Sequence, residues 1–232
     1  MIENLKKHFV YMSRFLTDAR MERFDEVLNR RTCRAIPILE DTVKEQNASA
    51  AIRTLDALGF HEVHLVENDR NVSLNTSISK GSDKWLDLRK SNDMRSTLRG
   101  LKQRGYKIVA THLHKDGVDL KDLDTATPLA IVFGNEWDGI SDVVEEEADA
   151  FVQIPMYGFV ESYNLTVSIG IVFSHLRWKM EENNRVTPLT EEQIYTSKLQ
   201  WAIRSSRSGK KVYAKWLEET GQSDLSGMLK TS

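Results

Sequence analysis

Disulfides, long apolar runs and a surplus of charge of one sign are all missing from this sequence, and each absence narrows the class of protein. The 232 residues include one cysteine, Cys33, which excludes an internal disulfide framework and fits a reducing compartment. No apolar run approaches the ~20 residues that a membrane-spanning helix needs. The N-terminal residues lack the apolar core and small-residue cleavage site of a signal peptide. We therefore expect a soluble cytoplasmic protein with no membrane partner.

The charge balance is close to neutral. A formal net charge of −2 and an isoelectric point near 6.3 do not by themselves indicate a nucleic-acid-binding protein. Local basic clusters can still attract RNA, and this chain has one near each end, from Lys6 to Arg34 and from Arg204 to Lys215. A run of charges is most often only a solvated surface, so both interpretations stay open at this point.

Several catalytic signatures are also missing. No G-x-G-x-x-G segment follows a strand pattern, which argues against a Rossmann-type dinucleotide or methyltransferase site. The Walker A loop and the G-x-S-x-G nucleophile elbow are absent as well. Six histidines are scattered along the chain, and no cysteine or carboxylate arrangement completes a zinc site. A metal-dependent mechanism is therefore disfavoured, and we expect no metal.

What is present in the middle of the chain is an alternation of short apolar segments and helical patterns. This alternation predicts an α/β domain with a parallel sheet flanked by helices. We expect strands at 35–40, 61–67, 84–88, 107–113, 129–134 and 151–154. We expect helices after Thr17, before Gly59, from Ser91 to Gly105, from Ser141 to Ala148, from Leu165 onward, and after Thr190, which forms a capping box with Gln193.

The same patterns divide the chain into three parts. They are a basic helical extension (1–33), the α/β domain (34–182) and a second basic helical extension (183–232). The last helix carries apolar residues that need a partner, which is either the N-terminal helix or a second subunit.

Polar residues cluster where the predicted strands end, and parallel strands bring such ends to one edge of a sheet, where ligands bind. Asn47 and Arg53 lie six residues apart on one helix, so we expect them on broadly similar faces. Taken singly, each residue has an ordinary explanation as a helix cap, a turn residue or a surface charge. The candidates are Asn47, Arg53, Thr111, Gly134, Glu136, Ser162 and Asn164.

Three segments resemble the consecutive motifs of the SPOUT-class RNA 2′-O-methyltransferases, within which the TrmH type is the most similar. They are NASAAIRTLDALGFHEVHLVE, IVFGNEWDGIS and IPMYGFVESYNLTVS. The opening LTDARMERFDEVLNRRT and ATHL (110–113) favour the TrmH type, which methylates a D-loop guanosine of tRNA. The resemblance implies a C-terminal deep trefoil knot, a homodimer, S-adenosylmethionine as the cofactor and tRNA as the partner.

The resemblance also implies roles for individual residues. The cofactor would bind largely to backbone groups of Thr111, Gly134, Ile154 and Tyr163. Arg53 matches the catalytic arginine, with Asn47, Glu136, Ser162 and Asn164 as supporting polar residues. Because the pKa of arginine lies above ~12, we favour a charged Arg53 that clamps phosphate or stabilises negative charge, over a deprotonated Arg53 acting as the base.

The third motif departs from the family pattern, and the substrate has alternatives. Tyr163 stands where the family usually has leucine, and Leu165-Thr166 where Val-Ser is common. The alternatives to tRNA methylation are ribose methylation of ribosomal RNA and an RNA-binding protein without catalysis. The basic C-terminal extension is expected to help hold tRNA.

Overall fold

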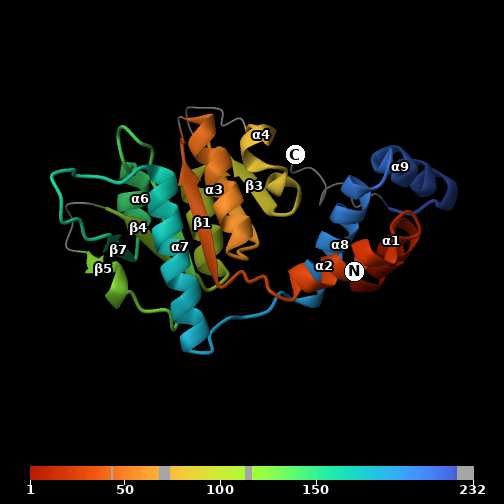
Figure 1. Cartoon of the computed structure of the whole chain (residues 1–232), viewed down its shortest axis with the longest axis horizontal. Coiled ribbons are helices and arrows are strands. Elements are labelled where there is room, and N and C mark those ends of the chain that lie inside the picture. The colour runs from red at the N-terminus through yellow and green to blue at the C-terminus, as the bar shows by residue number, and fades with distance from the viewer. Residues whose placement is uncertain (43, 68–73, 113–116, 224–232) are drawn as a thin grey trace. The chain divides into compact units, whose positions relative to one another are not determined.

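The chain divides into two compact units in the computed structural model (Figure 1). The structure describes residues 1–42, 44–67, 74–112 and 117–223. One unit is formed by Thr32–Thr187, and the other by the two ends of the chain, Met1–Arg31 and Pro188–Ser232.

The central unit is built on a parallel sheet of seven strands in the order β3-β2-β1-β6-β4-β7-β5. Each described strand pair is parallel, and β1 pairs with β6 in a register that sets Ile38 beside Val132. The strands are β1 (Ala35–Glu40), β2 (Glu62–Val66), β3 (Asp87–Ser91), β4 (Lys107–Thr111), β5 (Val118–Asp119), β6 (Leu129–Phe133) and β7 (Ala150–Gln153). Every residue of β1 and β6 is buried, as expected for the centre of a parallel sheet.

Helices cover both faces of this sheet, and alternate strand residues face the two layers. Leu39 and Ile131 share one core cluster with residues of α3 (Glu45–Ala57) and α7 (Leu165–Glu182). Ile38 and Val132 share the other cluster with residues of α5 (Met94–Gln103) and α6 (Asp142–Glu147). The period of two along the strands therefore produces two hydrophobic layers from one run of apolar residues.

Two aromatic contacts hold α7 against the sheet. The ring centroid of Phe173 lies 4.7 Å from the ring centroid of Phe60 and 6.1 Å from that of Phe133. The first turn of α7 lies next to that of α3, since the Thr166 hydroxyl donates to the Asn47 backbone oxygen at 3.2 Å. Short elements complete the unit. They are α4 (Thr76–Ser79) and the 3₁₀ turns η1 (Ser82–Lys84) and η2 (Leu120–Asp122).

The amino-terminal edge of the sheet contains an ion pair between a buried carboxylate and a half-buried arginine. The Glu62 side chain is fully buried and accepts two hydrogen bonds from Arg104, at 2.6 and 2.7 Å. Burial alone would raise the pKa of Glu62, but hydrogen bonds with Arg104 and with His64 outweigh it and lower that pKa to about 2. The pair lies at the opposite edge from the strand ends discussed below.

The two ends of the chain form the second unit, in which α1 packs against α8. This confirms the N-terminal helix as a partner for the apolar residues of the C-terminal helix. Phe24 of α2 meets Trp201 of α8 edge to face, and His8 of α1 bonds the Tyr213 hydroxyl of α9 at 2.6 Å. The helices are α1 (Ile2–Ser13), α2 (Asp18–Leu28), α8 (Glu191–Ser205) and α9 (Gly209–Thr220).

Most of the expected elements are confirmed, including the caps at Thr17, Ser141 and Asn164 and the capping box of Thr190 with Gln193. Among the described residues, no helix combines the length and the apolar character needed to cross a membrane.

Four expectations about elements are wrong. Asp93, not Ser91, caps α5, because Ser91 is the last residue of β3. The strand expected at 84–88 lies at 87–91, since 82–84 forms a 3₁₀ turn. The basic C-terminal helix is two helices, because the chain breaks at Ser208, whose φ is 55°. In addition, the strand expected to reach Leu113 ends at Thr111, and Leu113 itself lies outside the described residues.

Candidate active site

The candidate residues follow strands that are neighbours in the sheet. The ends of β1, β6 and β7 precede Asn47, Glu136 and Asn164 respectively, and Thr111 is the last residue of β4. These four strands are adjacent in the order β1-β6-β4-β7. The parallel arrangement brings their carboxyl ends to one edge, as the sequence predicted. Sites in open α/β sheets lie at such edges.

Asn47, Glu136 and Asn164 form a hydrogen-bonded network at this edge. The Nδ2 of Asn47 donates to Oε1 of Glu136 at 2.5 Å, and Nδ2 of Asn164 donates to Oδ1 of Asn47 at 3.3 Å. Asn47 is 9% exposed, and both its amide nitrogen and its amide oxygen are hydrogen-bonded to these neighbours. Three segments far apart in the sequence are thus joined through a single amide.

The loop that carries Glu136 folds back on itself. Asn135 and Gly139 exchange backbone hydrogen bonds, and Oδ1 of Asn135 accepts from the N–H groups of Trp137 and Asp138. Gly134 allows this turn, because a Cβ there would lie 2.1 Å from the carbonyl carbon of Gly139. The loop therefore requires glycine at 134.

Asn164 has two roles. Its Oδ1 accepts from the N–H of Thr166 at 2.9 Å and caps α7, while its Nδ2 reaches Asn47. The cap interpretation and the site interpretation are therefore both correct for this residue. The cap interpretation is wrong for Asn47, since Lys44 occupies the cap position of α3.

Two contributors to the site were missed from the sequence. Thr166 donates its hydroxyl to the backbone oxygen of Asn47 at 3.2 Å. In the sequence, the feature that pointed to Thr166 is the departure from the family pattern at 165–166. Glu40, the last residue of β1, accepts hydrogen bonds from Ser141 at the end of the Glu136 loop. In the sequence, the feature that pointed to Glu40 is a carboxylate at the end of the otherwise apolar strand AIPILE.

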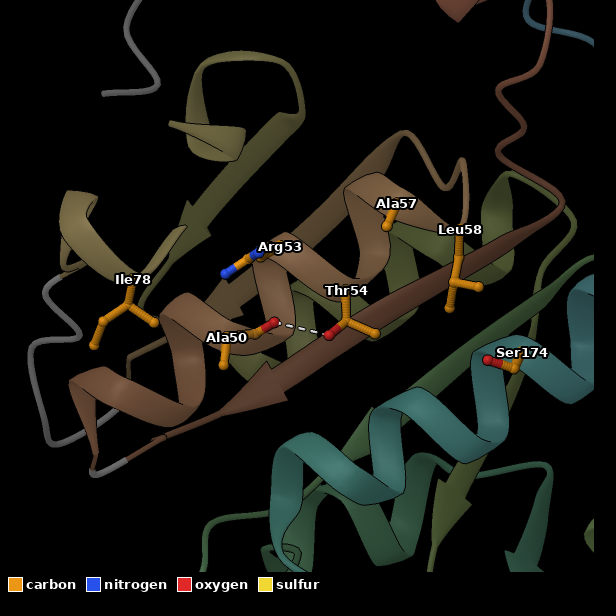
Figure 2. A pocket seen from close by; sticks show the side chains of 7 residues that line it. All are labelled: Ala50, Arg53, Thr54, Ala57, Leu58, Ile78 and Ser174. Carbon is orange, nitrogen blue, oxygen red and sulfur yellow. Dashed lines mark hydrogen bonds between the residues drawn. The ribbon is translucent and has the colours of Figure 1, made fainter. Parts of the chain in front are cut away.

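Arg53 lies apart from the network. The expectation that Arg53 shares a face with Asn47 is wrong, because at 3.6 residues per turn six residues leave the two side chains about 120° apart. Asn47 is buried and Arg53 is exposed. Arg53 lines a pocket of about 440 Å³ with residues of α3, Ile78 and Ser174, and its side chain points away from Ser174 (Figure 2). Among the described residues, Arg53 has no hydrogen-bond or ion-pair partner.

The remaining candidates are distributed around the same edge. Ser162 is exposed, and Tyr163 is 38% exposed. The hydroxyl of Thr111 donates to the Val132 backbone oxygen at 3.1 Å, so its side chain is occupied within the sheet. Ile154 is half-buried and packs against the core. Across the described part of the chain, no group of three or more histidine, cysteine or acidic side chains could hold a metal ion.

These features define an α/β protein with a candidate ligand site at the carboxyl edge of its sheet, where two amides and one carboxylate form a hydrogen-bonded network. The chain belongs to the SpoU rRNA Methylase family, whose sequence model matches residues 35–174. This confirms the resemblance stated above.

Individual relatives cover most of the chain. A tRNA (guanosine(18)-2'-O)-methyltransferase of Borreliella burgdorferi is 38% identical over 184 residues, which are 79% of this chain and 84% of that protein. The enzyme of the same name from Thermus thermophilus is 34% identical over 204 residues, covering 88% of this chain and 98% of that protein.

Solved structures are similar as well. The A. aeolicus TrmH/SpoU tRNA modifying enzyme superposes with a TM-score of 0.71 and 31% identity, over 89% of this chain and 98% of that chain. An AdoMet-bound rRNA methyltransferase from Sinorhizobium meliloti gives a TM-score of 0.59 and 27% identity, over 66% of this chain and 59% of that chain.

Proposed function

We propose that this protein transfers a methyl group from S-adenosylmethionine to the 2′-oxygen of a ribose in tRNA. The observation that carries the proposal is the network of Asn47, Glu136 and Asn164. It occurs in a chain that matches, over most of its length, relatives named for this reaction. Those names specify guanosine 18, so we propose a D-loop guanosine as the target.

The residues at the sheet edge fit S-adenosylmethionine as a cofactor. Gly134 carries no side chain that would block its backbone, Ile154 offers a half-buried apolar surface, and Thr111 keeps its hydroxyl within the sheet. We propose that backbone groups of Thr111, Gly134, Ile154 and Tyr163 hold the cofactor. When bound, S-adenosylmethionine supplies a methyl group already activated by its sulfonium charge.

The residues of this chain then need mainly to align the ribose oxygen and to help remove its proton. We propose that the network of Asn47, Glu136 and Asn164 gives the fixed geometry, with Ser162 as a further polar contact at its exposed border. Arg53 acts as a charged clamp on a phosphate or on negative charge that develops at the 2′-oxygen. Its exposed guanidinium keeps its donors available for such a ligand.

Further properties belong to the same proposal. We propose that the C-terminal part of the central unit forms a trefoil knot, that the enzyme is a homodimer, and that it works in the cytoplasm on tRNA. The boundaries proposed for the functional parts are 1–33, 34–182 and 183–232. The basic residues of the two extensions would hold the tRNA backbone by charge.

The test is methyl transfer from labelled S-adenosylmethionine to unmodified total RNA by the wild-type protein, Arg53→Ala and Arg53→Lys. We expect label on a ribose of the tRNA fraction, lost in Arg53→Ala and mostly lost in Arg53→Lys, because only the guanidinium fork binds bidentately. Both variants should unfold at the wild-type temperature, since Arg53 is exposed.

Each of the other possible results would contradict a different part of the proposal. Label confined to ribosomal RNA would keep the chemistry and overturn the substrate. Full activity of Arg53→Lys would contradict the bidentate clamp. No label in any RNA, together with no binding of S-adenosylmethionine in calorimetry, would overturn the enzyme and favour an RNA-binding protein without catalysis.

A further inference from the structure

A buried carboxylate lies directly behind the loop that carries Glu136. Glu40 is 2% exposed and ends β1. Its Oε1 accepts from the hydroxyl of Ser141 at 2.6 Å, and its Oε2 accepts from the backbone N–H of Ser141 at 3.0 Å. One residue therefore satisfies both carboxylate oxygens, and that residue follows the Glu136 loop directly.

The position of Glu40 connects two of the segments that build the site. The last registered pair of β1 and β6 is Leu39 with Phe133, so Glu40 lies one step beyond it, beside the start of the loop at Gly134. Its bonds to Ser141 reach the end of the same loop. Asn47, which bonds Glu136 at 2.5 Å, follows Glu40 by seven residues and lies in the first turn of α3.

Stability alone does not explain a carboxylate at this place. Burial raises the pKa of Glu40, while its hydrogen bonds from Ser141 oppose the rise. Ser141 caps α6 through its own hydroxyl, which accepts from the N–H of Val144. The helix therefore begins without needing Glu40, and a charge buried here carries a cost that an apolar side chain would avoid.

We propose that Glu40 is a positioning residue that fixes the Glu136 loop against β1 and so keeps Glu136 within reach of Asn47. This inference rests on the proposed function, because it assigns Glu40 a task in the same site. It acts through Ser141 and Glu136 and does not require Glu40 to touch either substrate.

The experiment compares wild type with Glu40→Gln in methyl transfer and in amide hydrogen exchange. A glutamine keeps the shape but carries no charge and accepts through one oxygen only, so both contacts with Ser141 are weakened, even if its Nε2 turns to donate to the Ser141 hydroxyl. We expect faster exchange over 134–141, kcat lowered by about 10- to 100-fold, and an unchanged KM for tRNA. In a Glu136→Gln background, Glu40→Gln should lower kcat by less than about threefold, because the two act as one unit.

Asp149→Asn is the matched control. Asp149 precedes β7 at the opposite edge, and its carboxylate also accepts a backbone N–H, from Ile108 at 2.7 Å. We expect this variant to lose stability without the change in kcat or in loop exchange.

Two results would overturn the inference. One is unchanged exchange over 134–141 in Glu40→Gln, and the other is an equal loss of kcat with and without Glu136. Absence of methyl transfer by the wild-type protein would overturn the proposed function instead, and the exchange measurement would still decide whether Glu40 tethers the loop.

Discussion

The closest backbone approach in the site occurs at Gly134, and it makes Gly134→Ala a sharp test of how the Glu136 loop is held. A Cβ at this position would lie 2.1 Å from the carbonyl carbon and 2.2 Å from the oxygen of Gly139, and 2.4 Å from the nitrogen of Ile140. All three are backbone atoms, so no side-chain rotation can relieve the overlap.

The size of the effect follows from these distances. Non-bonded carbon atoms rest roughly 3.5 Å apart or more, so the loop must move by about 1 Å. A shift of that size misaligns the 2.5 Å bond between Asn47 and Glu136. We expect a loss of about 1–3 kcal/mol in the free energy of unfolding and of about 10²-fold in kcat.

The assays are denaturant unfolding and methyl transfer, with Gly100→Ala as the control. Gly100 lies inside α5, and a Cβ there meets nothing within 4 Å, so this variant should keep full activity and gain roughly 0.5–1 kcal/mol of stability. A Gly134→Ala protein with kcat within about threefold of wild type would refute the reasoning, because the loop would then tolerate displacement.

Three further variants or conditions test other contacts. Glu62 has a pKa of about 2 in the folded protein against 4.5 for the unperturbed group, so its pairing with Arg104 stabilises the fold fully above pH 4.5. We expect the free energy of unfolding to fall by about 3 kcal/mol as the pH is lowered from 4.5 toward 2, measured by acid unfolding followed by circular dichroism. Thr190→Ala should lower the free energy of unfolding by about 1 kcal/mol, because it removes the capping-box bond to Gln193. An unchanged midpoint of unfolding in denaturant would show that α8 does not depend on its cap. Asn47→Ala leaves Glu136 without its amide donor, so we expect kcat to fall while the KM for tRNA stays the same, and a change confined to KM would place Asn47 in substrate binding instead.

The central strands and their parallel direction could be predicted from the sequence, because local patterns and tertiary packing agree there. AIPILE and LAIVF are nearly continuous apolar runs, and they form β1 and β6, which are buried at every residue and adjacent near the centre of the sheet. The caps at Ser141 and Asn164 were found for the same reason, since each satisfies a local backbone donor that its own helix leaves open.

The contacts between individual side chains could not be predicted, because they depend on how the helices and strands pack and not on spacing in the sequence. Asn47 and Arg53 are on one helix, but only the packing of α3 decides which of them is turned toward Glu136. The bond from Thr166 to the Asn47 backbone oxygen depends on where α7 lies against α3. Ser91 and Asp93 are both good capping residues, and the pairing of β3 with β2 extends through Ser91, which leaves Asp93 as the cap.

The candidate site therefore contains two kinds of polar group: side chains that are hydrogen-bonded to one another before any ligand binds, and an exposed arginine. Asn47 and Asn164 bond to each other, and Glu136 accepts from Asn47, so this part keeps a fixed geometry. Arg53 is exposed, and its five donors can all turn to a ligand. A group held by its neighbours serves alignment, whereas a group with open donors serves recognition of negative charge. The reaction we propose needs both, because an activated methyl group demands alignment and the RNA that receives it carries a phosphate at every nucleotide.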